Sequence, residues 1–505
     1  MIKLIYRIES DYMSKKRMLI VTSVTLSVVT ISLGIVKLYQ TYALSNYIGT
    51  VTDTGIDVYI NDDSYASIPA NGSSNVYYML TNTNPGTVKY GVAYQTTSGV
   101  TVKVYDTSED PATGTIEEND KKYIKLHLEN KNSTNKTIEL STVLGYENGG
   151  DLVVPSGVTL VTDTYTPPPT AAEYITKLYT TASKTTVTNN SITYNTAPSV
   201  SLMNDRLGGT TTDLDGGNIR YYGASPNNYI YFNCSDYSNQ TSSTCETWRI
   251  IGVFDGKLKL IRGSQIGTYS WDNKDTSTGA ESNFGKNDWT TARLMKLLNP
   301  SDYYTTDFND NNLGQGLYYN SASGKCYSGQ NNATVDCNFT STGIKNDITR
   351  NMIAETTYNL GGWNSNTVYP NLMYEKERGT TVYTGRPTTP WTGKIALAYT
   401  SDYGYAADLN QCKDKTLYDY NNSTCTSNNW MKAIITNNGS NSGWLLTPYC
   451  STSSNVWYVY SGGIVYFNYT VYSAFGAVPV LSLSSELGIE SGGDGSSSNP
   501  YKLSA

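Results

Sequence analysis

Histidine is almost absent from this chain. Its single copy, His127, excludes histidine-based catalytic triads, two-histidine iron sites and histidine-rich zinc sites. We therefore expect neither a bound metal nor a cofactor.

Charged residues are also scarce. They make up 16% of the 505 residues, below the roughly 25% of ordinary soluble domains. The net charge of −7 excludes nucleic acid as a partner, because phosphate contacts need a basic surface. In their place stand 45 tyrosines and 43 glycines, a composition that suits a cell surface. The length allows about three domains.

An uncharged run follows a basic amino terminus. Residues 1–17 are mainly basic, and Met18 to Val36 carry no charge. As a helix, this run spans roughly 28 Å, close to the thickness of a bilayer core. The sequence predicts a cytoplasmic segment (1–17), a transmembrane signal anchor (18–37) and an extracytoplasmic linker (38–53). The membrane is then a partner, which residues 18–36 contact. The alternative is secretion after cleavage near Ala43.

Cysteine and tryptophan divide the exported part. All seven cysteines lie at or after Cys234, and all eight tryptophans at or after Trp248. We predict a β-sandwich at 54–163, a proline-rich linker with a short helix (171–182) at 164–190, and a mostly β α+β domain at 191–505. The last domain includes a β-hairpin turning at Asp255-Gly256 and a helix at 346–359.

Short alternating strands characterise residues 54–163. Ile124, Leu126 and Leu128 share one face of a strand, and Lys125 and His127 the other. The pattern predicts an immunoglobulin-like sandwich without the cysteine-tryptophan core of antibody domains, and a solvent-facing His127.

The spacing of six cysteines suggests disulfides that each close a short loop. Neighbouring cysteines lie 11 to 13 positions apart across polar loops, and none has the C-x₂₋₄-C spacing of zinc sites. Export favours disulfides, although spacing alone leaves other pairings open. Cys450 is left as a buried free thiol or, alternatively, a reactive cysteine. The predicted disulfide residues are Cys234 with Cys245, Cys326 with Cys337, and Cys412 with Cys425.

The distal part carries a recognisable series of motifs. They are Trp248–Gly252, Ser270–Asp272, Asn287–Trp289, Leu298-Asn299, Lys394–Ala406, Trp444–Pro448, Val456–Gly463 and Gly476–Leu481. This series resembles bacterial extracellular domains of the C-type-lectin-like class, related to sulfatase-modifying factors. It is most similar to an uncharacterised surface-protein family with a Trp-Leu-Arg-Ser-Pro … Gly-Val-Arg-Pro tail. The resemblance implies a C-type-lectin-like fold; Leu446 and Val478 replace the two family arginines.

The fold class expected from these features is an N-terminal transmembrane helix, an all-β immunoglobulin-like sandwich and an α+β C-type-lectin-like domain with local disulfides.

The tail is the strongest functional signal. Alternation assigns Trp457 and Phe467 to the core. The outward residues form a predicted ligand-binding patch, because tyrosine gives rigid contact area at low entropy cost; plain cross-strand tyrosine pairing is the alternative. The patch comprises Tyr458, Tyr460, Tyr466, Asn468 and Tyr472.

Together these features predict a membrane-anchored bacterial surface protein that acts as an adhesin. Its expected partner is carbohydrate or a host-surface protein. The alternatives are a structural cell-wall or pilus-like spacer without a ligand, and an enzyme of unknown type. A glycosidase needs two positioned carboxylates, which sequence alone does not identify.

Overall fold

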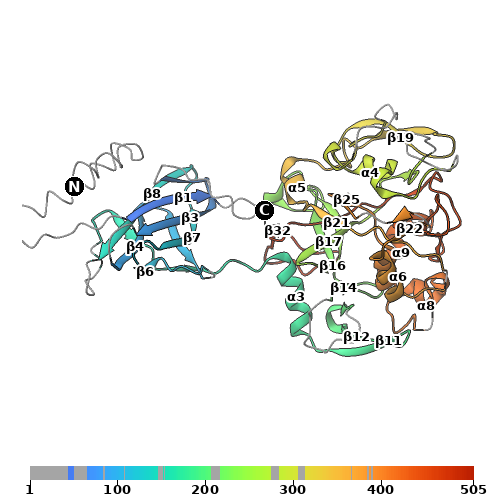
Figure 1. Ribbon diagram of the computed structural model, residues 1–505, viewed down its shortest axis with the longest axis horizontal. Coiled ribbons are helices and arrows are strands. Elements are labelled where there is room, and N and C mark those ends of the chain that lie inside the picture. Colours follow the sequence, from blue (N-terminus) through green and yellow to red (C-terminus); the bar gives the residue numbers. More distant parts are fainter. Residues whose placement is uncertain are drawn as a thin grey trace, which may run out of the picture. The chain divides into compact units, whose positions relative to one another are not determined.

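The computed structural model describes residues 44–50, 65–82, 86–106, 108–145, 152, 154–205, 217–273, 284–304, 313–365, 367–383, 386–387, 390–413 and 415–504. The chain divides into two compact units between Pro167 and Pro168 (Figure 1). The predicted cytoplasmic segment, the transmembrane run 18–36 and the cleavage point at Ala43 lie outside the described residues.

The described fold is mostly β-sheet with a few short helices. No helix in the described ranges is long and apolar enough to cross a membrane. Their longest helix, α3 (Ala171–Thr181), has 11 residues, or about 16 Å against a hydrocarbon core of about 30 Å. The predicted fold class, which began with a transmembrane helix, is therefore wrong as a description of this structure.

The first unit is built from two sheets. One has the order β1-β3-β7-β5-β10, the other β2-β8-β4-β6 with β9 on β4. The first sheet comprises β1 (Leu44–Thr50), β3 (Gly72–Asn82), β7 (Lys121–Asn130), β5 (Val100–Tyr105) and β10 (Thr164–Tyr165). The second comprises β2 (Tyr65–Ile68), β8 (Lys136–Gly145), β4 (Val88–Gln95), β6 (Thr113–Ile116) and β9 (Val158–Leu160).

One hydrophobic core joins these two sheets. Ile124, Leu126 and Leu128 of β7 pack in it with Leu140 of β8, as alternation predicts. The prediction of a solvent-facing His127 is wrong, since this residue is only 6% exposed. The ring of Tyr165, on β10, stacks on the imidazole and covers it.

The second unit centres on a large antiparallel sheet with the order β11-β12-β13-β14-β16-β17-β30-β25, and β15 pairs with β16. Its hairpin β16–β17 turns at Asp255 and Gly256, both with positive φ, as the sequence predicts. The strands are β11 (Thr185–Asn189), β12 (Ile192–Ala197), β13 (Leu202–Asn204), β14 (Ile219–Tyr221), β15 (Tyr229–Phe232), β16 (Glu246–Phe254), β17 (Lys257–Arg262), β30 (Val480–Ser482) and β25 (Ile395–Ala396).

A second sheet carries the tail, in the order β18-β29-β26-β27-β28. Its strands are β18 (Thr268–Tyr269), β29 (Phe475–Gly476), β26 (Gly443–Pro448), β27 (Val456–Val459) and β28 (Val465–Tyr466). Short pairs complete the unit: β19 (Ser323–Tyr327) with β20 (Thr334–Asn338), β21 (Thr356–Tyr358) with β24 (Trp391–Gly393), β22 (Thr381–Tyr383) with β23 (Arg386–Pro387), and β31 (Gly488–Ile489) with β32 (Leu503–Ser504).

Short helices pack around these sheets. The helix α3 begins with a capping box of Thr170 and Glu173, and its buried residues belong to the core of the second unit. The second unit therefore begins before residue 191. The other α-helices in the described ranges are α4 (Arg293–Leu298), α5 (Asp347–Met352), α6 (Pro370–Glu377), α7 (Thr400–Tyr405), α8 (Ser423–Ser427) and α9 (Trp430–Ile435).

The disulfides pair as predicted: Cys234 with Cys245, Cys326 with Cys337, and Cys412 with Cys425. Cys450 is a buried free cysteine. Three disulfides indicate an extracellular or secreted protein, because cytosolic thiols are kept reduced.

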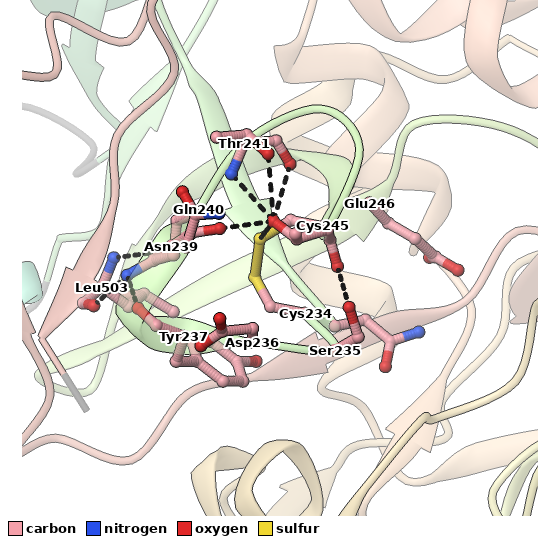
Figure 2. Close-up of a disulfide and its surroundings, with 12 residues drawn as sticks. Cys234, Ser235, Asp236, Tyr237, Asn239, Gln240, Thr241, Cys245, Glu246 and Leu503 are labelled. Carbon is pink, nitrogen blue, oxygen red and sulfur yellow. Dashed lines mark hydrogen bonds between the residues drawn. A yellow bond between two sulfur atoms is a disulfide. The ribbon is translucent and has the colours of Figure 1, made fainter.

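The Cys234–Cys245 loop also holds the end of the chain (Figure 2). The Gln240 amide nitrogen donates to the Leu503 carbonyl at 2.6 Å, and the Leu503 N–H donates back to the Gln240 side chain at 2.9 Å. This disulfide therefore stabilises both its own loop and the contact with β32.

Candidate functional site

Several exposed or half-buried side chains follow one another between residues 460 and 472. We call them the tail surface, which consists of Tyr460, Tyr466, Phe467, Asn468, Tyr469 and Tyr472. Tyr460 is 48% exposed and Tyr469 45% exposed. Asn468 is exposed, and Tyr466, Phe467 and Tyr472 are half-buried. Of the five predicted patch residues, Tyr460, Tyr466, Asn468 and Tyr472 thus reach the surface.

Tyr458 does not, and its predicted outward orientation is wrong. It is fully buried because β27 lies between β26 and β28 with a hydrophobic core on each face. Val456 and Tyr458 pack in one core, and Trp457 and Val459 in the other. The side chains of β27 alternate between its two faces as predicted, but both faces are covered by protein and neither meets solvent.

Tyr458 instead supports the tail surface from below. Its hydroxyl donates a hydrogen bond to the Asn468 side-chain oxygen. Its ring lies 6.3 Å from that of Tyr466 and 5.6 Å from that of Tyr469, both edge-on. Burial, and then the neighbouring Tyr469 and Tyr466, raise the pKa of Tyr458. The phenol therefore stays protonated and keeps donating to Asn468.

Two asparagine side chains, of which Asn287 is buried and Asn455 half-buried, fix the backbone beneath the surface. The Asn455 amide nitrogen donates to the Phe467 carbonyl at 2.9 Å. The Asn287 amide nitrogen lies 3.1, 2.9 and 2.8 Å from the carbonyl oxygens of Tyr449, Thr452 and Asn455. Tyr449 stacks on Phe467 with ring centroids 4.0 Å apart. A carbonyl that is bonded inside the protein cannot reorient toward water, so this part of the surface is pre-organised.

The loop after β28 is anchored as well. The buried Val471 donates its N–H to the Ser454 carbonyl at 2.8 Å, and the Ser270 hydroxyl donates to the Tyr472 carbonyl at 2.8 Å. Tyr472 stacks on the exposed ring of Phe284, with centroids 5.8 Å apart. Phe284 is a member of this neighbourhood that the sequence patterns did not single out.

The segment that builds this surface carries no charge. No Asp, Glu, Lys, Arg or His occurs between Lys432 and Glu486. At its margin, Lys286 and Asp288 pair with each other at 3.2 Å. This long uncharged run can be read directly from the sequence and distinguishes the tail from the rest of the chain.

A second polar cluster lies inside the unit. Asp402 of α7 contacts Arg220 at 2.8 Å and Lys259 at 2.5 Å, and Arg220 also contacts Asp205 at 2.5 Å. All four side chains are buried. Burial alone raises the pKa of Asp402, but Lys259 and Arg220 outweigh it and lower that pKa. The cluster ties α7 to β14 and β17 and acts as a structural anchor.

Glu377 is a further buried carboxylate. It accepts hydrogen bonds from the Ser401 N–H at 3.0 Å, the Ser401 hydroxyl and the Thr447 hydroxyl at 2.7 Å. Burial raises the pKa of Glu377. Within the described ranges, no group of three His, Cys, Asp or Glu residues could hold a metal ion.

The positions of the two replaced family arginines lie in the interior. Leu446 is 1% exposed and Val478 is 3% exposed, and each packs in a hydrophobic core. Neither therefore contributes to the tail surface.

Comparison with known proteins finds no family model that matches the chain and no curated protein with a similar sequence. The resemblance to a bacterial surface-protein family thus stays a prediction.

Proposed function

We propose that this extracellular protein binds uncharged carbohydrate through the tail surface. The observation that carries the proposal is the combination of exposed aromatic rings with a segment free of charge between Lys432 and Glu486.

The chemistry of the surface favours a sugar over a charged ligand. Aromatic rings offer flat apolar faces for the C–H faces of a pyranose, and tyrosine and asparagine supply hydrogen bonds to its hydroxyl groups. An anionic ligand needs arginine or lysine to compensate its charge, and this segment provides neither.

The rigid support of the surface also favours binding. Tyr458, Asn455 and Asn287 hold the side chains and carbonyls beneath it. A pre-organised surface loses less conformational entropy when it binds a ligand.

The test is a glycan panel probed with the full chain, wild type and the double variant Tyr460→Ala/Tyr469→Ala. We expect the wild type to retain neutral glycans in preference to their sialylated or sulfated forms. The double variant should lose that binding at an unchanged melting temperature, because both rings are about half exposed and contribute little to folding.

Two tyrosines of the first unit supply a matched control. Tyr65 is 45% exposed and Tyr123 46% exposed, so Tyr65→Ala/Tyr123→Ala removes the same surface area elsewhere. This control should bind as the wild type does. Equal binding by all variants, or no retained glycan in the panel, would contradict the proposal and favour a spacer without a ligand.

A further inference from the structure

The only histidine of the chain sits in a stack of rings in the first unit. The His127 ring lies parallel to that of Tyr165, with centroids 3.6 Å apart and an interplanar angle of 8°. Tyr105 meets Tyr165 edge-on at 5.0 Å. His127 Nδ1 lies 2.7 Å from the Asn75 side-chain oxygen. Tyr165 thus covers an imidazole that would otherwise face solvent.

The strand that carries Tyr165 has few other attachments. β10 pairs with β5 over two residues only. The Val104 N–H donates to the Asp163 carbonyl at 2.9 Å, and the Asp106 N–H donates to the Tyr165 carbonyl at 3.1 Å. Prolines 167–169, which have no N–H, follow almost directly. A short edge strand of this kind opens with a small free-energy change, so the ring stack decides whether it stays docked.

The charges around His127 act on its protonation in opposite directions, Glu129 in favour and Lys103 against. Its Nε2 lies 3.5 Å from Glu129 Oε1, but Lys103 Nζ already pairs with the same oxygen at 3.4 Å. A second cation there would meet a carboxylate whose charge Lys103 partly compensates. The Lys125 ammonium lies over the Tyr105 ring at 4.3 Å. Lys131 lines a groove of about 500 Å³ beside the imidazole. The other titratable and charged groups that face the imidazole are Glu129 of β7, Lys103 and Tyr105 of β5, and Tyr165 of β10.

We infer that the His127–Tyr165 stack is a pH-sensitive clasp, in which the neutral imidazole holds β10 against β5 and the imidazolium formed in acid releases it. Release adds residues 163–165 to the segment before the proline tract. At about 3.3–3.6 Å for each extended residue, the segment lengthens by about 10 Å.

The burial of His127 determines the direction in which pH changes the stability of the docked strand. Burial lowers the pKa of His127 below its ordinary 6.5; Glu129 opposes this effect and Lys103 adds to it. Because the docked state prefers the neutral ring, its stabilisation is complete above the ordinary pKa. It is lost as the pH falls through the lower pKa of the docked state.

The test follows single amides of the full chain by hydrogen exchange at about pH 5 and about pH 8, which bracket the ordinary pKa, after correction for intrinsic rates. The Asp106 amide, which donates to β10, should exchange severalfold faster in acid. The Val92 amide, which donates to the Ala112 carbonyl at 2.8 Å, is the internal control and should not change. The single imidazole resonance should titrate with a midpoint below 6.5.

Two variants separate the clasp from general loosening. His127→Phe keeps a ring for stacking and removes the titration, so the Asp106 amide should stay protected at both pH values. Tyr165→Ala removes the other ring of the stack. The Asp106 amide should then exchange fast at both pH values. Equal protection of the wild type at both pH values, or an acid effect that persists in either variant, overturns the clasp.

Discussion

The two units are held together in different ways. The first has one hydrophobic core between two sheets and contains neither cysteine nor tryptophan. The second has cores on both faces of β27, three disulfides and a buried cluster of charges. In the second unit the disulfides close local loops across 11 to 13 positions, whereas the charge cluster joins residues far apart in the sequence. A surface that must stay rigid while exposing aromatic rings benefits from the second arrangement.

The largest expected effect concerns the charge cluster. Asp402→Asn leaves the buried Lys259 without its carboxylate partner, while Arg220 keeps only Asp205. The loss of one partner from a buried ion pair should cost about 3–5 kcal/mol. All eight tryptophans lie in the second unit, so denaturant unfolding followed by tryptophan fluorescence reports that unit alone. Asp336→Asn, at an exposed pair with Lys325, is the control. If both variants lowered the free energy of unfolding equally, the charge cluster would not be a structural anchor.

A core truncation should affect the first unit alone. Leu126 is fully buried in the sandwich, and Leu126→Ala should cost about 2–5 kcal/mol. The single His127 resonance should report earlier unfolding while the tryptophan transition stays in place. Thr115→Ala, at an exposed position of β6, should change neither. A tryptophan transition that moves with Leu126→Ala would show that the units do not unfold separately.

Removal of one disulfide should have a somewhat smaller effect on the second unit. Cys412→Ala/Cys425→Ala opens a loop that the disulfide closes across a separation of 13 and should cost about 2–4 kcal/mol in the tryptophan-detected transition. Cys450→Ala changes a cysteine that has no disulfide and serves as the control. A double variant as stable as that control would mean that this disulfide contributes little.

The smallest effect should come from the amide beneath the tail surface. Asn287→Ala leaves three carbonyls without their shared donor and should cost about 1–3 kcal/mol. It should also weaken glycan binding, since the surface loses part of its support. Asn421→Ala, at an exposed asparagine, should do neither. Unchanged binding by Asn287→Ala would show that the surface does not depend on this support.

Local patterns predicted part of the fold. The alternation of β7, the hairpin turn at Asp255-Gly256 and the helix α3 were all predicted from neighbouring residues. The predicted helix at 346–359 is wrong beyond Met352, because the Ala354 N–H donates to the Ser482 carbonyl and β21 follows. Long-range pairing overrides local propensity there.

The candidate site was predicted less completely, for a related reason. Alternation distinguishes the two faces of a strand but does not show which faces are covered. Tyr458 was misassigned because β27 is enclosed on both faces. His127 was misassigned because Tyr165 lies against it. In each case the covering residues are not neighbours along the strand.

The most direct test of the central claim is hydroxyl-radical footprinting of the full chain with a retained neutral glycan. Tyr460, Tyr469, Tyr65 and Tyr123 are almost equally exposed, so their oxidation rates without ligand should be similar. We predict that the glycan protects Tyr460 and Tyr469 and leaves Tyr65 and Tyr123 unchanged. Protection of the tyrosines of the first unit, or of none of the four, would contradict the account.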